Sequence, residues 1–100
     1  MLFMIFCEDK PNSMELRMQT RPAHLDYIQP LVNESRLLCA GPTPFYDPEN
    51  TGKLGVSGSL IIAEFDSLQE AQDWAANDPY ALAGLFSSVI VKPYLVVLPK

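Results

Sequence analysis

Histidine, cysteine and basic side chains are scarce in this chain of 100 residues, which has one His, two Cys, and seven Lys plus Arg against twelve Asp plus Glu. A net charge of −5 provides no basic stripe to neutralise nucleic-acid phosphates, so nucleic acid is not expected as a partner. Neither Cys7 nor Cys39 has a Cys or His neighbour at metal-ligand spacing, which argues against a zinc site. We interpret both cysteines as small core residues in a reducing compartment.

Long apolar runs are also missing. The longest, Met1 to Cys7, is far shorter than the ~20 residues that a membrane-spanning helix needs, and it lacks the basic flank of a secretory signal. Gly52, Gly55 and Gly58 do not link a strand to a helix, so no dinucleotide fingerprint is present. We therefore expect a cytoplasmic protein with no cofactor, metal, membrane or nucleic-acid partner.

The composition predicts one domain over residues 1–100, since 48% of the residues are hydrophobic and the length suits a single core. Apolar runs, helical periodicity and capping signals predict six main elements and one short turn. These are a strand at 1–7, a helix at 13–35, strands at 37–40 and 59–65, a helix at 67–76, a helical turn at 79–84 and a strand at 85–97. This order is typical of an α+β, ferredoxin-like β-α-β-β-α-β antiparallel sheet with helices on one face.

Two segments are harder to predict. Pro22 and Pro30 fall inside the first helix, which we expect to be bent or broken. The segment between Ala40 and Ser59 is rich in Pro and Gly and predicts a long loop. Such a loop is either a lid over a binding site or an ordinary excursion between two strands.

The strand pattern also predicts a partner. The first strand is apolar at every position, and the last combines Val89 to Val91 with Leu95 to Val97. Strands with this pattern are usually covered on both faces, whereas two helices cover only one. A second copy packed sheet to sheet solves the problem at this size, so we predict a homodimer.

His24 is the main candidate for chemistry, because histidine is the side chain whose ordinary pKa lies near neutral pH. In a continuous helix, Arg17, Arg21 and His24 share one stripe with apolar residues. The arginines either bind an anionic small molecule or extend past the helix end to water. A lone histidine on an apolar face is more often a core residue than a catalyst. Asp78, followed by Pro79, is by itself typical of a helix cap.

Several short motifs together resemble the YciI-like family. They are Met1-Leu2-Phe3, Arg21-Pro22-Ala23-His24-Leu25, Arg36-Leu37-Leu38, Ala40-Gly41-Pro42, Gly58-Ser59, Ala63-Glu64-Phe65, Asp78-Pro79-Tyr80 and Val91-Lys92-Pro93-Tyr94. The resemblance runs nearly end to end and implies the dimeric α+β barrel superfamily. It also implies a His-Asp pair, which falls on His24 and Asp78, in a family of enzymes largely without assigned substrates. Pro30 departs from the pattern and affects the bend that aims His24.

From these residues we hypothesise that His24 is a general acid/base whose other ring nitrogen is bound by Asp78. The compatible reactions are isomerisation, lyase-type elimination and hydrolysis of a small, anionic or hydroxylated substrate. Arg21 and Arg17 would hold the substrate, and the segment Ser57-Gly58-Ser59 would supply backbone donors. The alternative is a non-catalytic binding or accessory module, in which His24 and Asp78 form only an internal hydrogen bond.

Overall fold

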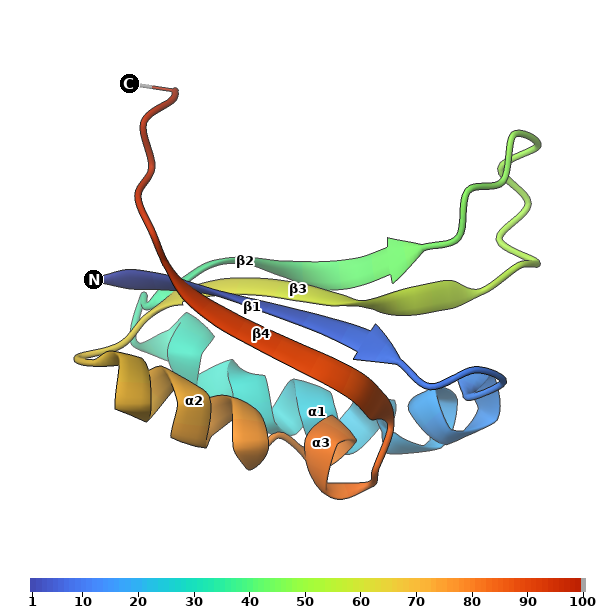
Figure 1. Ribbon diagram of the computed structural model, residues 1–100, viewed down its shortest axis with the longest axis horizontal. Helices are drawn as coiled ribbons and strands as arrows, with labels where there is room; N and C mark the ends of the chain where they lie inside the picture. Colours follow the sequence, from blue (N-terminus) through green and yellow to red (C-terminus); the bar gives the residue numbers. More distant parts are fainter. Residues whose placement is uncertain (100) are drawn as a thin grey trace.

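The computed structural model, which describes residues 1–99, has one four-stranded sheet with three helices (Figure 1). Its elements are β1 (Leu2–Asp9), α1 (Met14–Asn33), β2 (Leu37–Pro44), β3 (Val56–Glu64), α2 (Leu68–Ala76), α3 (Pro79–Leu82) and β4 (Phe86–Tyr94). The strand order is β2-β3-β1-β4, and each pair of neighbours is antiparallel. The predicted α+β, ferredoxin-like arrangement is confirmed.

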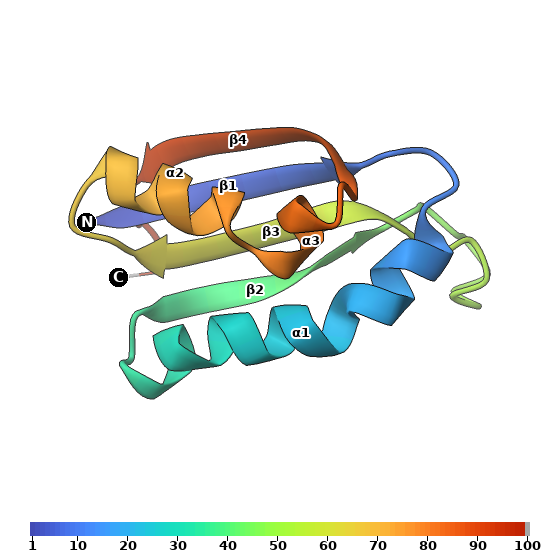
Figure 2. The ribbon, with the colours of Figure 1, turned by 90° about the horizontal axis from the view of Figure 1, so that it is seen from below.

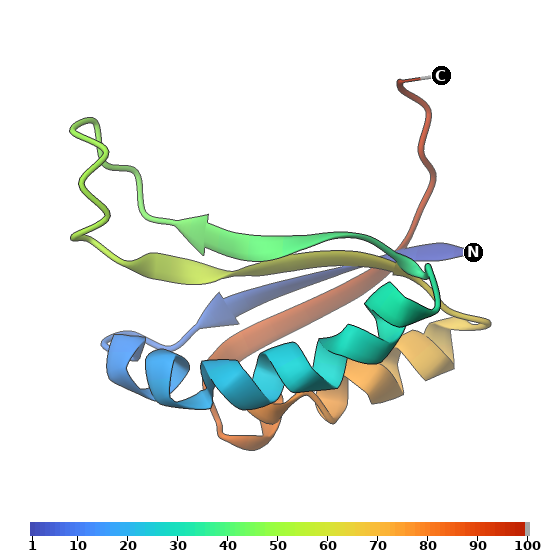
Figure 3. The same ribbon diagram turned by 180° about the vertical axis from the view of Figure 1, so that it is seen from behind.

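All three helices lie on one face of the sheet, and the opposite face is uncovered (Figures 1 and 3). Strand β1 shows the difference residue by residue: Phe3, Ile5 and Cys7 are buried toward the helices, whereas Met4 and Phe6 are only partly buried. The core between sheet and helices consists of Phe3, Ile5, Cys7, Ile28, Leu31, Ile61, Ala63, Phe65, Ala71 and Ala75. The chain therefore completes one side of its sheet by itself.

Helix α1 is bent and not broken, although it contains both Pro22 and Pro30. In Figure 2 its first turns run at an angle to the rest. Pro22 has no N–H for the helical ladder, and the Thr20 hydroxyl donates to the Leu16 carbonyl at 2.8 Å, which favours a bend at this point. Both halves of α1 thus face the sheet, and the buried side chains are Arg17, His24, Ile28 and Leu31.

Strands β2 and β3 are longer than predicted, and β4 is shorter. We expected the second strand to end at Ala40, but β2 continues to Pro44. It is an edge strand, where proline can occupy ladder positions that need no outward N–H donor. The connection to β3 therefore shrinks to residues 45–55. Strand β4 ends at Tyr94, short of the expected Val97, and the segment after it leaves the sheet on the uncovered side (Figure 1).

The interpretation of both cysteines as core residues is wrong for Cys39. Cys7 is buried, but Cys39 is exposed. Cys39 pairs with Ile62, which pairs with Met4, so its register places it on the uncovered face near the sheet edge. An apolar strand pattern cannot distinguish the two faces of a sheet when only one is covered.

Helix ends follow the predicted capping signals. The Ser67 hydroxyl accepts from the Glu70 N–H at 3.0 Å, and Asp78 caps α3. None of the helices within residues 1–99 is both long enough and apolar enough to cross a membrane.

Candidate active site

His24 and Asp78 meet between α1 and the start of α3. The imidazole Nδ1 lies 2.9 Å from each oxygen of the Asp78 carboxylate. Both residues are buried, with 8% of His24 and 2% of Asp78 exposed. Asp78 also accepts the Tyr80 N–H at 2.9 Å, as the cap of α3. The two interpretations of Asp78, helix cap and histidine partner, are therefore both correct for the same carboxylate.

This contact selects the form of the imidazole. An ionised carboxylate only accepts hydrogen bonds, so the hydrogen lies on Nδ1 and the lone pair lies on Nε2. Within residues 1–99, Nε2 makes no hydrogen bond, and no buried side-chain nitrogen or oxygen lacks a partner. Nε2 therefore reaches the molecular surface, where an incoming molecule can contact it.

Tyr80 is a site residue that the sequence analysis missed. Its ring stacks on the His24 imidazole with centroids 4.2 Å apart and 19° between the planes. The Arg17 Cζ lies 4.7 Å from the centroid of the same ring. The signal was available, because Tyr80 completes Asp78-Pro79-Tyr80, but the sequence alone does not bring this ring against α1.

Arg17 is held inside the protein by two acceptors. Its Nε and Nη2 donate to the Asp9 carboxylate at 2.7 and 3.0 Å, and Nη2 also donates to the Ser59 hydroxyl at 2.8 Å. Only 5% of Arg17 is exposed, so its charge is largely neutralised by Asp9 and not offered to solvent. We call the whole group the polar cluster: Asp9, Arg17, His24, Ser59, Asp78 and Tyr80.

The polar cluster changes the acidity of its neighbours. Burial raises the pKa of the Cys7 thiol to about 12, with a further contribution from the charges of Asp78 and Asp9. Burial also raises the pKa of the Tyr80 phenol, although the charges of Arg17 and Arg21 oppose the change. At neutral pH both groups therefore keep their protons, and Cys7 is not a nucleophile.

The other predicted substrate-binding residues are dispersed. Arg21 is exposed on α1, and its charge acts on Tyr80. The Ser57 hydroxyl donates to the Thr43 carbonyl at 3.0 Å, within the β2–β3 pair. Gly58 lies in the ladder opposite Glu8, and a Cβ at this position would clash with the Cys7 carbonyl. These contacts give Ser57 and Gly58 structural reasons for their identity.

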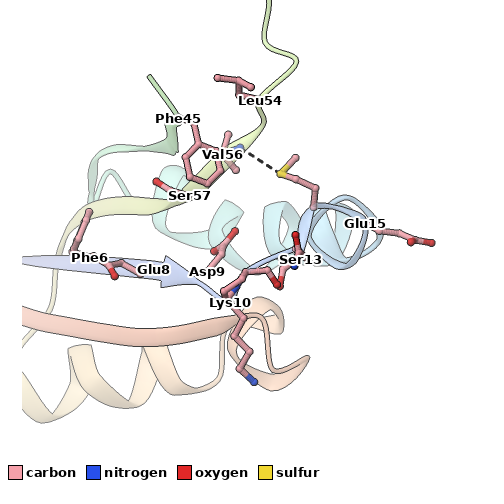
Figure 4. Close-up of a pocket in the computed structure, with 13 residues that line it drawn as sticks. Phe6, Glu8, Asp9, Lys10, Ser13, Glu15, Phe45, Leu54, Val56 and Ser57 are labelled. Atoms are coloured by element: carbon pink, nitrogen blue, oxygen red, sulfur yellow. Dashed lines mark hydrogen bonds between the residues drawn. The ribbon is translucent and has the colours of Figure 1, made fainter. Parts of the chain in front are cut away.

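A cavity of about 750 Å³ lies beside the polar cluster, between the end of β1, the first turn of α1 and the loop 45–55 (Figure 4). Asp9 lines it and is also the partner of Arg17. The Met14 Sδ accepts the Val56 N–H at 3.4 Å and ties the loop to α1. Neither His24 nor Asp78 is among the lining residues, so this cavity does not contain the imidazole.

The lining of the cavity is apolar with several hydrogen-bond acceptors. Its apolar side chains include Phe6, Met14, Phe45, Leu54 and Val56. Glu8, Asp9 and Ser57 supply oxygens, whereas the Lys10 side chain points away from the cavity in Figure 4. This lining suits hydroxylated molecules better than anions, because carboxylates accept hydrogen bonds from hydroxyl groups and repel negative charge.

Comparison with known proteins identifies both a family and a solved relative. The family model of the YCII-related domain matches residues 1–95. Protein YciI of Escherichia coli is 50% identical over 94 residues, which cover 94% of this chain and 96% of that protein. A protein of Emericella nidulans named "Derivative of benzaldehyde biosynthesis cluster protein C" is 36% identical over 75 residues, which cover 74% of this chain and 76% of that protein.

Among solved structures, the chain is similar to 5-chloro-2-hydroxyhydroquinone dehydrochlorinase (TftG) of Burkholderia phenoliruptrix, in complex with 2,5-dihydroxybenzoquinone. The TM-score is 0.84 at 35% identity, and the match covers 95% of this chain and 94% of the other. A relative with almost the same length and a similar fold is therefore an enzyme that acts on a small hydroxylated aromatic compound.

Proposed function

The chain belongs to the YCII-related domain family, and from this premise we propose that it is a cofactor-independent enzyme that moves protons on a small hydroxylated organic substrate. The observation that carries the proposal is the buried His24–Asp78 pair, with Nδ1 fixed at 2.9 Å from the carboxylate and Nε2 free. Lyase-type elimination is the reaction we favour, because a solved relative at 35% identity is a dehydrochlorinase.

In the proposed reaction His24 is the general base and then the general acid. Nε2 takes a hydroxyl proton from the substrate, and the imidazolium that forms is stabilised by the Asp78 carboxylate. When the substrate carries chlorine, the electron pair of the broken O–H bond moves into the ring, and the imidazolium returns a proton to the ring carbon that bears chlorine, which becomes tetrahedral. His24 then takes the proton of a second hydroxyl, whose electron pair moves into the ring as chloride leaves with the electrons of the C–Cl bond. Two hydroxyl protons are removed and one proton is added to carbon, and the product is a quinone. The loss of one proton and one chloride balances without an oxidant or reductant.

The polar cluster favours a neutral, hydroxylated substrate over an anionic one. Arg17 already pairs with Asp9 at 2.7 Å, so it does not provide a free positive charge. Arg21 is the exposed cation near Tyr80, and it is suited to a partial negative charge that develops during the reaction. The alternative of a carboxylate or phosphate substrate has no comparable support.

The test is chloride release from 5-chloro-2-hydroxyhydroquinone by the wild-type protein and by His24→Gln. We expect the wild type to release chloride and the variant to lose activity by about 10²- to 10⁴-fold, the usual contribution of general acid/base catalysis. The glutamine amide can still donate to Asp78, so a thermal melt checks that the fold persists. Release that does not depend on His24 contradicts the mechanism.

The binding-module alternative predicts a different result in the same assay. The ring compound would then bind and be recovered unchanged, and His24→Gln would alter only its affinity. That outcome would overturn the proposed enzyme.

We also propose that the protein forms a homodimer through the uncovered sheet face and acts in the cytoplasm. Ile90 and Tyr94 are 42% and 39% exposed on this face, and apolar residues project beyond it at both ends. They are Phe45, Tyr46 and Leu54 in the loop and Leu95, Val97 and Leu98 after β4. Both segments rise on the uncovered side (Figures 1 and 3), where they would flank a second copy.

A further inference from the structure

The Tyr80 hydroxyl has no acceptor for its hydrogen among residues 1–99. Asp9 and Ser59 take the hydrogens of Arg17, and Asp78 takes those of His24 Nδ1 and the Tyr80 N–H. The Arg17 guanidinium acts on the hydroxyl, but it is a donor only and cannot accept its hydrogen. Tyr80 Oη as a donor and His24 Nε2 as an acceptor are thus both open to a partner from outside the chain.

These two atoms are well placed for one ligand. The rings are stacked at 4.2 Å, and Asp78 holds both at the same end, through His24 Nδ1 and the Tyr80 backbone. The free atoms lie away from that anchor. Only 2% of Tyr80 is exposed, and its hydroxyl hydrogen has no acceptor among residues 1–99, so a molecule bound at His24 Nε2 would find no competing acceptor for it. One open acceptor and one open donor therefore belong to the same pair of stacked rings.

We propose that Tyr80 is a second catalytic residue, whose hydroxyl donates a hydrogen bond to a substrate oxygen while His24 Nε2 exchanges a proton with a neighbouring hydroxyl. The inference rests on the proposed function and deepens it. It defines the substrate class as rings that carry a hydroxyl beside a second oxygen able to accept, as in hydroxylated quinones and their reduced forms. The donor stabilises negative charge on that oxygen as the proton leaves.

The protonation state of Tyr80 supports a role as a hydrogen-bond donor and not as a base. Burial raises the pKa of the phenol, so the proton stays on Oη at neutral and mildly alkaline pH. Arg17 lies over the ring at 4.7 Å and fixes its orientation. The tyrosine is thus held before the substrate arrives, which lowers the reorganisation needed during the reaction.

The chain contains a matched control in Tyr27. Tyr27 lies on α1 and stacks on Trp74, with centroids 4.8 Å apart and 28° between the planes. Its hydroxyl donates to the Trp74 carbonyl at 2.8 Å, so it is already satisfied within the chain. Replacing either tyrosine by phenylalanine removes one hydroxyl and keeps one stacked ring, and the two variants differ in whether that hydroxyl has a partner.

The experiment compares Tyr80→Phe with Tyr27→Phe in chloride release from 5-chloro-2-hydroxyhydroquinone. We expect Tyr80→Phe to lower kcat about 100-fold with little change in KM or thermal stability. Tyr27→Phe should keep kcat and lower the melting temperature slightly, because the Trp74 carbonyl loses one of its donors, the Tyr27 hydroxyl. Equal kcat in Tyr80→Phe and wild type, with the wild type active, would overturn the inference and leave the proposed enzyme intact.

A binding measurement separates failure of the inference from failure of the proposed function. Calorimetry with 2,5-dihydroxybenzoquinone needs no turnover. If wild type binds it but releases no chloride from the chlorinated compound, a several-fold weaker affinity in Tyr80→Phe and an unchanged one in Tyr27→Phe would support the contact. Equal affinities in all three proteins would contradict it.

Discussion

Both faces of the sheet carry apolar side chains, but the side chains of the two faces are buried to different extents. On the helix-covered face, the core side chains are buried, and the side chains of the polar cluster form hydrogen bonds with one another. On the other face, residues such as Ile90 and Tyr94 remain about 40% exposed. Folding of one chain therefore completes the covered face and leaves apolar side chains of the second face exposed, where we propose that a second copy packs.

The comparison shows why the polar cluster lies where it does. A buried ion pair and a buried His-Asp pair each lose hydration, and this loss is tolerated only when neighbours complete their hydrogen bonds. Helix α1 contributes Arg17 and His24, and the strands contribute Asp9 and Ser59. Asp78 comes from the N-cap position of α3. The uncovered face has no helix to supply such partners, so its side chains are mainly apolar.

The largest expected effect comes from Asp78→Asn, which changes the hydrogen bond to the imidazole on the covered face. The Tyr80 N–H would donate to the new amide oxygen, and the amide nitrogen would then donate to His24 Nδ1. This moves the ring hydrogen to Nε2 and removes the base, so we expect chloride release to fall about 10³- to 10⁴-fold. The assay is that used for His24→Gln.

Asp26→Asn is the matched control for this change. Asp26 is exposed on α1, two residues after His24, so loss of its charge should leave the rate unchanged. A rate in Asp78→Asn within about threefold of that in Asp26→Asn would show that the aspartate is only a helix cap.

Sequence reasoning predicted the fold and the His24–Asp78 pair, and its errors have physical causes. Element order and caps follow from local patterns, and the family resemblance named both members of the pair. The strand ends were missed because Pro42 and Pro44 suggest a loop, although an edge strand tolerates them. The roles of Asp9 and Tyr80 depend on contacts between residues far apart in the sequence, such as Arg17 against Asp9 and His24 against Tyr80. No local pattern encodes those contacts.

A smaller effect is expected when the uncovered face is broken by Ile90→Asp. Ile90 lies opposite Phe6 on this face and is 42% exposed, so a single chain should fold with the new charge. In a dimer the carboxylate would be buried without a partner, which should weaken association by at least about 100-fold. Light scattering across a concentration series measures the shift from dimer to monomer.

Leu82→Asp is the control for the uncovered face, because Leu82 is 70% exposed on α3 at the helical side. It should leave the mass unchanged. A wild-type protein that is monomeric at tens of micromolar would contradict the dimer.

The smallest effect distinguishes the two faces by their thiols at alkaline pH. Cys7 is buried on the covered face, and burial raises the pKa of its thiol from 9.0 to about 12, while Cys39 is exposed. The folded chain holds the Cys7 proton that the unfolded chain releases, so this contribution to stability is complete below pH 9 and is lost as pH rises toward 12. Between pH 9 and 10.5 one such proton lowers the free energy of unfolding by at most about 2 kcal/mol.

Urea unfolding of Cys7→Ala and Cys39→Ala isolates the contribution of the Cys7 proton, because the tyrosines titrate in both variants. We expect Cys39→Ala to keep the wild-type loss of stability and Cys7→Ala to show a shallower one, even though the missing sulfur lowers its stability at every pH. If the free energy of unfolding depends on pH equally in the two variants, the environment of Cys7 is no less hydrated than that of Cys39. The contrast between the two faces would then not hold at Cys7 in β1.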